Sequence, residues 1–271
     1  MNKKLCISIV LFNNELQLIE NVLNCCSKEI SFEDIYLIDN STNSKLEILK
    51  SSYGVNYLKK QNRGFGAGHN AGFKNFDLLN RYQYTLILNP DIIFEKNTII
   101  NLVKFLDTNI EVGALMPKIL NFDGSLQHAR RCLPTPKHLF FKKFFPKSNC
   151  AKEYELKGNE PTKPIQLIAI CGCFMLIRNK VLEEVNLFDE RFFMYFEDFD
   201  LARRISMVSK VIYYPLEKVY HLAQREHRKN FKLFLSLIFS AIKYFLKWGI
   251  FDDYRDVSNH KLIKKFQKFS L

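Results

Sequence analysis

Three carboxylates stand among aromatic side chains in the segment FFMYFEDFD at residues 192–200, just before a run with helical spacing. Apolar surroundings raise the pKa of a carboxyl group, and a neighbouring negative charge raises it further. A raised pKa suits a group that must accept a proton near neutral pH. Glu197 and Asp198 are therefore candidates for acid–base chemistry. The alternative is that Asp198 caps a helix and the aromatic residues belong to the core.

Two further carboxylates, Asp39 and Asp91, fall at or just past the ends of predicted strands. The carboxyl ends of parallel strands line the crevice where ligands bind in open α/β sheets. A carboxylate there can accept a hydrogen bond from a base or a ribose, or hold a hard divalent cation against a diphosphate. Each aspartate alone is also compatible with a turn. Their shared position favours binding.

Four glycines occur in the segment NRGFGAGHNAG at residues 62–72, between a predicted strand and a predicted helix. Glycine lets backbone amides approach a ligand closely, and the start of a helix favours an anion. Residues 66–71 also fit a dinucleotide-binding fingerprint, with Asp91 about 20 residues further on. That interpretation is weak, because the fingerprint would follow the third strand rather than the first.

His221 ends an apolar run that begins at residue 211. A lone histidine is most often structural, although an imidazole can complete a divalent metal site that a carboxylate begins. The residues alone leave both interpretations open.

Short apolar runs alternate with helical spacings along the first part of the chain, which predicts a parallel sheet covered on both faces. The predicted strands are 5–11, 35–39, 55–58 and 84–89, and the predicted helices are 15–26, 43–52, 69–80 and 97–107. Beyond residue 107 the expected elements are strands at 112–117, 165–177 and 210–214, a basic loop at 128–152 and a helix at 196–207.

The composition is that of an ordinary globular protein, with 271 residues, 47% hydrophobic and 25% charged. It excludes disorder and collagen-like repeats. The apolar run at 5–11 is too short for a signal peptide and lacks a small-residue cleavage site, so we expect a cytosolic protein. Seven cysteines without a CxxC pair indicate neither a disulfide framework nor a zinc ribbon.

The net charge of +12 is concentrated in two segments. Residues 128–152 and residues 222–271 each carry a net +7, and the rest of the chain carries −2. Such patches suggest an anionic partner, either a nucleic acid or a membrane leaflet. A basic nucleic-acid-binding module without catalytic activity is one alternative, but it leaves Asp39, Asp91 and the pair Glu197–Asp198 without a role.

The segment 231–251 is apolar except for polar residues that recur every three or four positions. On a helix these form one narrow stripe. The longest uncharged run, 233–242, is too short to span a bilayer, which favours a helix lying in the membrane interface. The alternatives are a helix docked on the rest of the chain or in a homodimer interface. The basic aromatic stretch 137–147 would be a second membrane contact.

Six blocks of this sequence, in the same order along the chain, resemble the inverting GT-A glycosyltransferases of family 2, and especially the rhamnosyltransferase-like branch of bacteria. The blocks are ISIVLFN at 7–13, IDNS at 38–41, NRGFGAGHNAGF at 62–73, LNPD at 88–91, GCFMLIR at 172–178 and FDERFFMYFEDFDLARR at 188–204.

The resemblance implies an α/β fold of GT-A type, with a Rossmann-like, mostly parallel sheet flanked by helices. It implies a glycosyltransferase domain at 1–221, with a nucleotide-binding half at about 1–117 and an acceptor half at about 118–221. Residues 222–271 would form a basic, amphipathic helical appendage.

The resemblance also assigns roles to residues. Asp198 would be the general base and Glu197 would orient the acceptor. Asp91 and His221 would hold Mg or Mn, because Asn89 stands where the family carries the first acid of its metal motif. The nucleotide sugar would contact Phe12, Asp39, Asn62, Arg63, Gly64, Gly66, Asn70 and Asn89.

By the same resemblance the reaction would transfer a sugar from a nucleotide-sugar donor. The first candidate is L-rhamnose from dTDP-rhamnose, and UDP-hexoses are the alternatives. The acceptor would be a glycan on a polyprenyl diphosphate, used in O-antigen-like surface polysaccharide synthesis. The enzyme would lie on the inner face of the bacterial plasma membrane, on an anionic surface, with no nucleic acid partner. A catalytically inactive relative is the remaining alternative.

Overall fold

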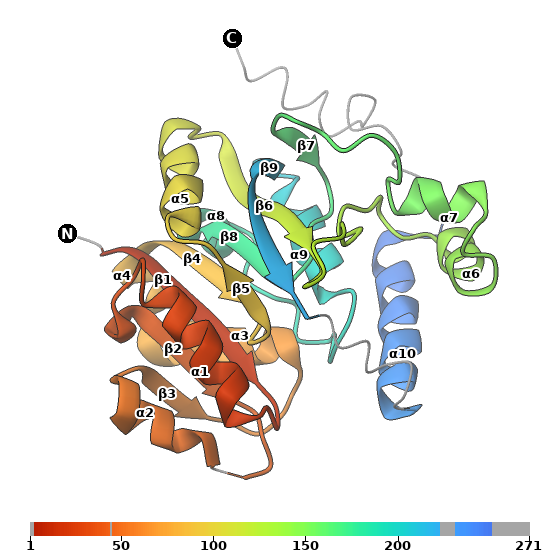
Figure 1. Ribbon diagram of the computed structural model, residues 1–271. Coiled ribbons are helices and arrows are strands. Elements are labelled where there is room, and N and C mark those ends of the chain that lie inside the picture. The colour runs from red at the N-terminus through yellow and green to blue at the C-terminus, as the bar shows by residue number, and fades with distance from the viewer. Residues whose placement is uncertain (1–2, 44, 223–230, 251–271) are drawn as a thin grey trace.

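The computed structural model describes residues 3–43, 45–222 and 231–250, and its centre is a nine-stranded sheet in the order β3-β2-β1-β4-β8-β6-β9-β5, with β7 also paired to β9 (Figure 1). The strands are β1 Lys3–Leu11, β2 Ile35–Asp39, β3 Asn56–Lys59, β4 Tyr82–Leu88, β5 Ile92–Phe94, β6 Val112–Leu120, β7 Ile165–Leu167, β8 Phe174–Arg178 and β9 Lys210–His221. The α-helices are α1 Leu16–Cys26, α2 Ile48–Tyr53, α3 Phe65–Phe76, α4 Leu78–Arg81, α5 Thr98–Thr108, α6 Pro136–Phe144, α7 Asn149–Tyr154, α8 Asn179–Glu184, α9 Glu197–Ile205 and α10 Phe231–Trp248.

The first four strands are parallel, as the alternating pattern predicts. Strands β2 and β4 flank β1, whose last six residues are buried, so this apolar run forms a central strand covered on both faces. The chain runs outward from β1 to β3 and then returns through α3 to β4 on the other side of β1. The order therefore reverses between β1 and β4, and a ligand crevice belongs at the carboxyl ends of these strands.

The second half of the sheet is mixed. Strand β8 runs antiparallel to both β4 and β6, and β6 is parallel to β9. Strand β5 pairs with the carboxyl end of β9, where Ile92 is opposite His221. This pairing brings the segment after β4 beside the end of β9. The predicted α/β fold with a largely parallel sheet is confirmed, with the antiparallel strands confined to its second half.

Several element boundaries predicted from sequence are wrong. Helix α3 begins at Phe65 rather than 69, so Gly66 and Gly68 lie inside the helix instead of in a loop before it. Tertiary contacts hold it there despite the low helix propensity of glycine. The basic stretch 128–152 is not one loop, since it contains α6 and α7, and the predicted strand 165–177 is divided into β7 and β8. Strand β9 extends beyond residue 214 to His221.

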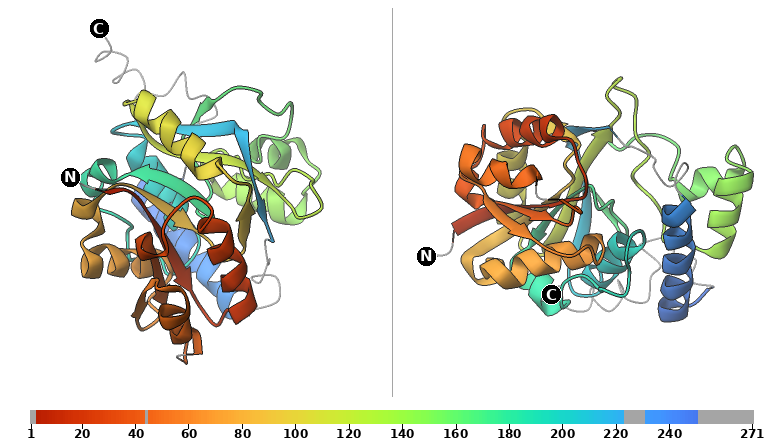
Figure 2. Two further views of the ribbon diagram at one scale, coloured as in Figure 1. Left: turned by 60° about the vertical axis from the view of Figure 1, so that its left-hand side comes forward. Right: turned by 90° about the horizontal axis from the view of Figure 1, so that it is seen from below.

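Helix α10 is docked against α9 and the segment before it, on the side of the molecule away from the N-terminal strands (Figure 2). Tyr244 is buried in a cluster with Phe196 and Phe199, and Ser240 donates a hydrogen bond to the Met194 carbonyl at 2.8 Å. The predicted helix is present, and of the predicted tail 222–271 the segments 223–230 and 251–271 lie outside the described residues. Among the described helices, none combines the length and apolar character needed to cross a membrane.

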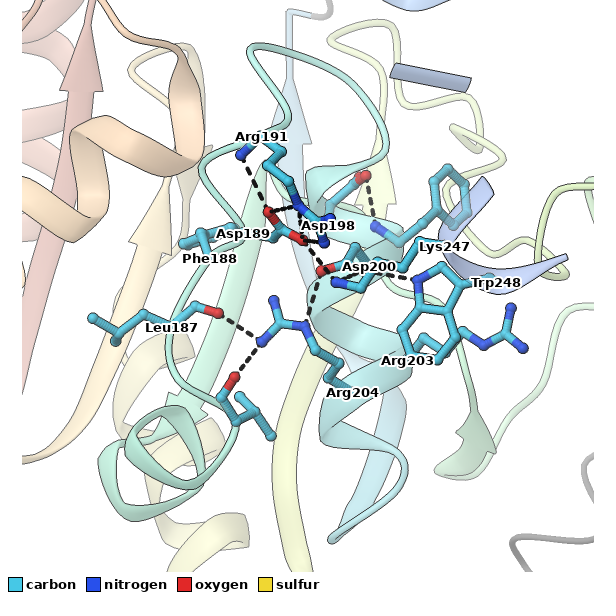
Figure 3. A network of polar contacts seen from close by, with 12 residues as sticks. Leu187, Phe188, Asp189, Arg191, Asp198, Asp200, Arg203, Arg204, Lys247 and Trp248 are labelled. Atoms are coloured by element: carbon cyan, nitrogen blue, oxygen red, sulfur yellow. Dashed lines mark hydrogen bonds and ion pairs between the residues drawn. The ribbon is translucent and has the colours of Figure 1, made fainter. Parts of the chain in front are cut away.

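Polar contacts fix the end of this helix (Figure 3). The indole of Trp248 donates to Asp200 at 2.8 Å, and Lys247 forms ion pairs with both Asp189 and Asp200. Asp200 is fully buried and also accepts from Arg204. Because these partners come from α9 and from the loop before it, α10 helps to hold the segment that carries Glu197 and Asp198.

Candidate active site

Asp198 lies in the first turn of α9, a helix that begins directly after two residues with left-handed backbone conformation, Tyr195 and Phe196. Its Oδ2 accepts from the Gly172 amide at 3.1 Å, and its Oδ1 accepts from the Phe199 amide at 2.9 Å. Burial raises the pKa of Asp198, and the two amides offset this only in part. A carboxylate with a raised pKa is suited to accept a proton.

Glu197 is more deeply buried than Asp198, with 6% of its surface exposed. Its Oε2 atom accepts no hydrogen bond from any residue that the structure describes. Burial, and then the adjacent charge of Asp198, raise the pKa of Glu197 well above its usual value. The pair therefore favours one protonated carboxyl and one carboxylate, because two adjacent buried charges repel each other.

Arg131 contributes positive charge to the same place, and sequence reasoning did not single it out. Its guanidinium lowers the pKa of Asp198, although less than burial raises it. The Nε atom of Arg131 is buried and has no hydrogen-bond partner among the described residues. The only sequence signal was that Arg131 lies in the basic stretch 128–152.

Asp91 and His221 face each other, as their predicted shared role requires. Asp91 Oδ1 lies 3.3 Å from His221 Nε2, and the Leu222 amide donates to the Asp91 carbonyl. Burial lowers the pKa of His221, but the hydrogen bond and negative charge of Asp91 outweigh it, so this pKa is raised. Gln127, which sequence reasoning missed, places its Oε1 2.8 Å from His221 Nδ1.

The pair Asp91–His221 has the donor set and spacing of a divalent cation site. Two ligand atoms at right angles around Mg²⁺, each about 2.1 Å from it, lie about 3 Å apart. Within the described part of the chain, no group of three or more His, Cys, Asp or Glu side chains gathers around a common point. These two protein ligands therefore leave most coordination positions for substrate oxygens and water.

Residues 172 and 173 bring the acidic pair and the Asp91 turn together. The Gly172 amide donates to Asp198, and the Cys173 carbonyl accepts from the Asn89 amide at 2.9 Å. Consecutive residues of one segment thus contact the candidate base and the start of the Asn-Pro-Asp turn. The predicted convergence of Asp198 with Asn89 and Asp91 follows from these contacts.

Asp39 lies two strands away at the same edge of the sheet. Leu11 of β1 pairs with Asp39, and extending the register between β1 and β4 places Pro90 beside Leu11. Two strand spacings amount to about 10 Å. Phe12, which follows Leu11 directly, is exposed at this edge.

The carboxylate of Asp39 is fully buried and already accepts hydrogen bonds from other residues of the protein. Its Oδ1 accepts from the Ser41 amide at 2.8 Å, and its Oδ2 accepts from the Tyr57 hydroxyl at 2.5 Å and from Lys59 at 3.1 Å. Burial raises the pKa of Asp39, but these hydrogen bonds outweigh it and the pKa is lowered. A nucleobase would therefore reach Asp39 only through a free lone pair or after Lys59 moves.

The glycine segment holds the loop before the acidic pair in place. Gly64 has φ of 110°, and a Cβ atom there would lie 2.1 Å from the Phe193 carbonyl oxygen. The same oxygen accepts from the Phe65 amide at 3.0 Å, so protein occupies part of the start of α3 where we expected an anion. Asn62 accepts from the Gly64 amide, and Arg63 is exposed.

Asn70 and Gly66 contact the same loop before the acidic pair, at Phe188. The side chain of Asn70 is buried, donating to the Phe188 carbonyl at 2.9 Å and accepting from the Phe188 amide at 3.1 Å. A Cβ at Gly66 would lie 2.8 Å from Phe188 Cβ. In this structure both residues contact the protein itself, and their predicted contact with a nucleotide sugar stays a prediction.

Comparison with known proteins gives a family and several relatives. Residues 6–185 match the family model described as Glycosyl transferase family 2. The chain is 28% identical over 201 residues to the low-salt glycan biosynthesis hexosyltransferase Agl10 of Haloferax volcanii, covering 73% of this chain and 61% of that protein. It is 29% identical over 144 residues to the N-acetylglucosaminyl-diphospho-decaprenol L-rhamnosyltransferase of Mycobacterium tuberculosis, covering 51% of this chain and 46% of that protein.

A third relative is the rhamnosyltransferase WbbL of Escherichia coli K12, at 25% identity over 238 residues, covering 82% of this chain and 85% of that protein. Among solved structures, GalNAc-T7 with UDP, GalNAc and Mn²⁺ has a TM-score of 0.59 at 17% identity, over 81% of this chain and 44% of that one. The mannosyltransferase PcManGT of Pyrobaculum calidifontis, in complex with GDP-Man and Mn²⁺, has a TM-score of 0.58 at 14% identity, over 91% of this chain and 65% of that one. These structural likenesses establish a shared fold.

Proposed function

The chain belongs to glycosyl transferase family 2, and on that premise we propose that it transfers a hexose from a nucleotide-sugar donor to a hydroxyl of a lipid-linked glycan, with inversion at the anomeric carbon. One observation carries the proposal. The candidate base Asp198 and the turn that holds Asp91 contact consecutive residues, Gly172 and Cys173. A proton acceptor and a diphosphate-binding pair are thus held at one place.

Asp198 accepts the proton of the acceptor hydroxyl as that oxygen attacks the anomeric carbon from the face opposite the nucleoside diphosphate. The C–O bond to the acceptor forms, the bond to the diphosphate breaks, and its electron pair leaves with the diphosphate. The amides of Gly172 and Phe199 fix the carboxylate in position. Glu197, buried beside it, orients this part of α9 and with it the acceptor.

Asp91 and His221 would hold the divalent cation, Mg²⁺ or Mn²⁺. When bound there, such a cation neutralises negative charge on the departing diphosphate. Asn89 has no carboxylate to offer and serves as a hydrogen-bonding group. Phe12 and the neighbourhood of Asp39 lie where the base and ribose of the donor would sit, and Arg63 is exposed and available to the diphosphate.

The names of the relatives support a choice of donor and acceptor. Two relatives bear rhamnosyltransferase names, and one of these names specifies an N-acetylglucosaminyl-diphospho-decaprenol acceptor. We therefore put dTDP-rhamnose first among the donors, with UDP-hexoses next, and a polyprenyl-diphosphate-linked glycan as the acceptor. With such an acceptor, the proposed location is the inner face of the bacterial plasma membrane, in an O-antigen-like surface polysaccharide pathway.

Transfer from a panel of nucleotide sugars to a short-chain N-acetylglucosaminyl-diphospho-lipid, with Mn²⁺ or Mg²⁺ added, tests the proposal. We expect one donor to give a product of inverted configuration and Asp198→Asn to abolish that product. Glu184→Gln, at an exposed position on α8, is the matched control. No product from any donor, with donor binding intact, contradicts the assignment.

A further inference from the structure

Helix α10 has a second apolar face, opposite the one that docks on α9. The docked face includes Leu237, Ala241, Tyr244 and Trp248. A separate stripe of large apolar side chains is exposed, and its members recur at helical spacing. They are Phe231, Ile238, Phe239, Ile242 and Leu246. A helix that is apolar on two faces has a second partner to cover it, because exposed apolar patches of this kind mark interaction sites.

Helix α6 extends this exposed face. Lys143 lies 4.3 Å above the ring of Phe234, so the two helices are adjacent, as Figures 1 and 2 show. Phe140, Phe144 and Phe145 are exposed, and the ring of Phe140 makes tilted contacts with those of Phe144 and Phe145, at 5.0 and 6.1 Å between ring centroids. We call the exposed apolar residues of α6 and α10, together with Phe145, the α6–α10 face.

The charge around this face identifies its partner. Neither α6 nor α10 contains an acidic residue, while Lys137, Lys143, Lys232 and Lys243 are exposed along them. A cavity of about 340 Å³ beside the face is lined by Arg191, Phe192, Lys243, Leu246 and Lys247. Exposed aromatic and aliphatic side chains bordered by lysines complement the acyl boundary and the phosphates of an anionic bilayer.

We propose that the α6–α10 face is the surface by which this protein docks on an anionic phospholipid bilayer. The proposal rests on the proposed function in one respect, since it explains how a lipid-linked acceptor reaches the site. Packed helices lie about 10 Å apart between their axes. Because α10 contacts α9 and Met194 directly, docking would place α9, the helix that carries Asp198, one helix layer in from the bilayer.

Sedimentation with vesicles of phosphatidylcholine, alone or mixed with phosphatidylglycerol, tests this surface. We expect the full chain to bind only the anionic vesicles, less tightly at high salt. Leu246→Ser and Phe239→Ser should each weaken binding roughly tenfold. Both positions are exposed, at 82% and 57%, so these variants should keep the wild-type melting temperature. Ile110→Ser, at a site 83% exposed after α5, is the matched control and should bind like wild type.

Three outcomes overturn the proposal. Unchanged vesicle binding by both variants would move the contact elsewhere in the chain. A homodimer in ultracentrifugation that Leu246→Ser dissociates, without vesicle binding, would make the face a subunit interface. Binding to an oligonucleotide but not to vesicles at physiological salt would make the partner a nucleic acid. Transfer to a water-soluble acceptor analogue reports on the proposed function separately, because it does not need the bilayer.

A second and independent inference concerns Gln127. Asp123 only accepts hydrogen bonds, so the Ser125 hydroxyl, 2.5 Å away, donates to it and accepts from the Asn121 amide group at 2.9 Å. Asn121 Oδ1 then accepts from Gln127 Nε2 at 3.2 Å. This chain of bonds fixes the orientation of the Gln127 amide and turns its Oε1 toward His221.

The consequence is a defined tautomer of His221. Because Gln127 Oε1 only accepts, His221 Nδ1 carries the hydrogen, and Nε2 faces Asp91. A neutral His221 thus presents a lone pair to a carboxylate oxygen, and either a proton or a metal ion must lie between them. We infer that Gln127 is a positioning residue that prepares His221 Nε2 for a divalent cation, by the general effect of partners behind a metal ligand.

Mn²⁺ affinity, measured by electron paramagnetic resonance without donor or acceptor, tests this role. Gln127→Ala should weaken Mn²⁺ binding by about 10 to 100-fold. Gln127→Glu, which keeps the acceptor, should restore it, and Gln83→Ala on the exposed side of β4 should leave it unchanged. Nitrogen NMR should show His221 protonated at Nδ1 in the wild type and as a mixture in Gln127→Ala. Equal Mn²⁺ affinity in wild type and Gln127→Ala, or wild-type His221 protonated only at Nε2, overturns the inference.

Discussion

The Gly172 amide holds the Asp198 carboxylate at 3.1 Å, and the absence of a side chain at position 172 lets the two segments approach this closely. A Cβ at position 172 would lie 3.2 Å from Asp198 Cβ and 3.6 Å from Phe65 Cε1. The turn at 171–173, just before β8, and the first turn of α9 therefore meet through the Gly172 amide and the Asp198 carboxylate. This contact sets the position of the candidate base.

Gly172→Ala is expected to move Asp198 by a few tenths of an ångström and to lower kcat by about tenfold, since catalysis is sensitive to such displacements. The melting temperature and the KM for the donor should change little. Steady-state kinetics with a saturating acceptor check this. A loss confined to KM would mean that Gly172 serves donor binding.

Asp198→Asn removes the proton acceptor while keeping the size of the side chain. We expect kcat to fall by about 100 to 10,000-fold, the usual contribution of a positioned base. Donor affinity, measured by calorimetry with the nucleoside diphosphate and Mn²⁺, should stay within about twofold. If affinity falls as far as kcat, then Asp198 is a binding or folding residue rather than the base.

Mn²⁺ binding should depend on the protonation of His221. Asp91 raises the pKa of this imidazole, and a protonated imidazole cannot ligate a metal. The affinity for Mn²⁺ should therefore be full above the raised pKa and fall as the pH drops through it, approaching tenfold per pH unit. Titration at several pH values measures this. In Asp91→Asn, which also lacks a metal ligand, proton NMR without metal should show the pKa of His221 shifted down, because the partner that raises it is gone.

Asp39 should contribute stability at neutral pH that acid removes. The pKa of Asp39 is lowered in the folded protein, so its contribution is complete above the unfolded value of about 3.9 and is lost as the pH falls through the folded value. Asp39→Asn should lower the free energy of unfolding by roughly 1 to 3 kcal/mol at pH 7. Urea unfolding should show that this difference in the free energy of unfolding between the wild type and Asp39→Asn disappears below about pH 4. Glu184→Gln, which is exposed, should show no such difference.

Helix α10 should unfold together with the rest of the described structure. Tyr244 is 1% exposed among aromatic residues of α9 and its preceding loop. Tyr244→Ala should lower the free energy of unfolding by about 3 kcal/mol, the usual loss for a buried aromatic residue. Near- and far-ultraviolet circular dichroism should give one coincident thermal transition. Separate transitions would mean that α10 is an independent appendage.

Much of the fold could be predicted because its signals are local. The apolar run at 5–11 and the alternation that follows it predict a central parallel strand and its neighbours, and the register between Leu11 and Asp39 agrees. The start of α3 was predicted wrongly from the glycine segment, because these glycines allow close packing of the helix against Phe188 and Val10. Local propensity carries no information on such contacts.

Residue types and their order along the chain made Asp198, Asp91 and His221 candidates, and the resemblance to family 2 gave them roles. Each residue alone is also compatible with a helix cap, a turn or a structural histidine. Only the tertiary structure decided that Gln127 lies behind His221, that Arg131 lies near Asp198, and that α10 has one docked face and one exposed face. These relationships join segments far apart in the chain. They depend on how the sheet and helices pack, and no short-range pattern of residues encodes that packing.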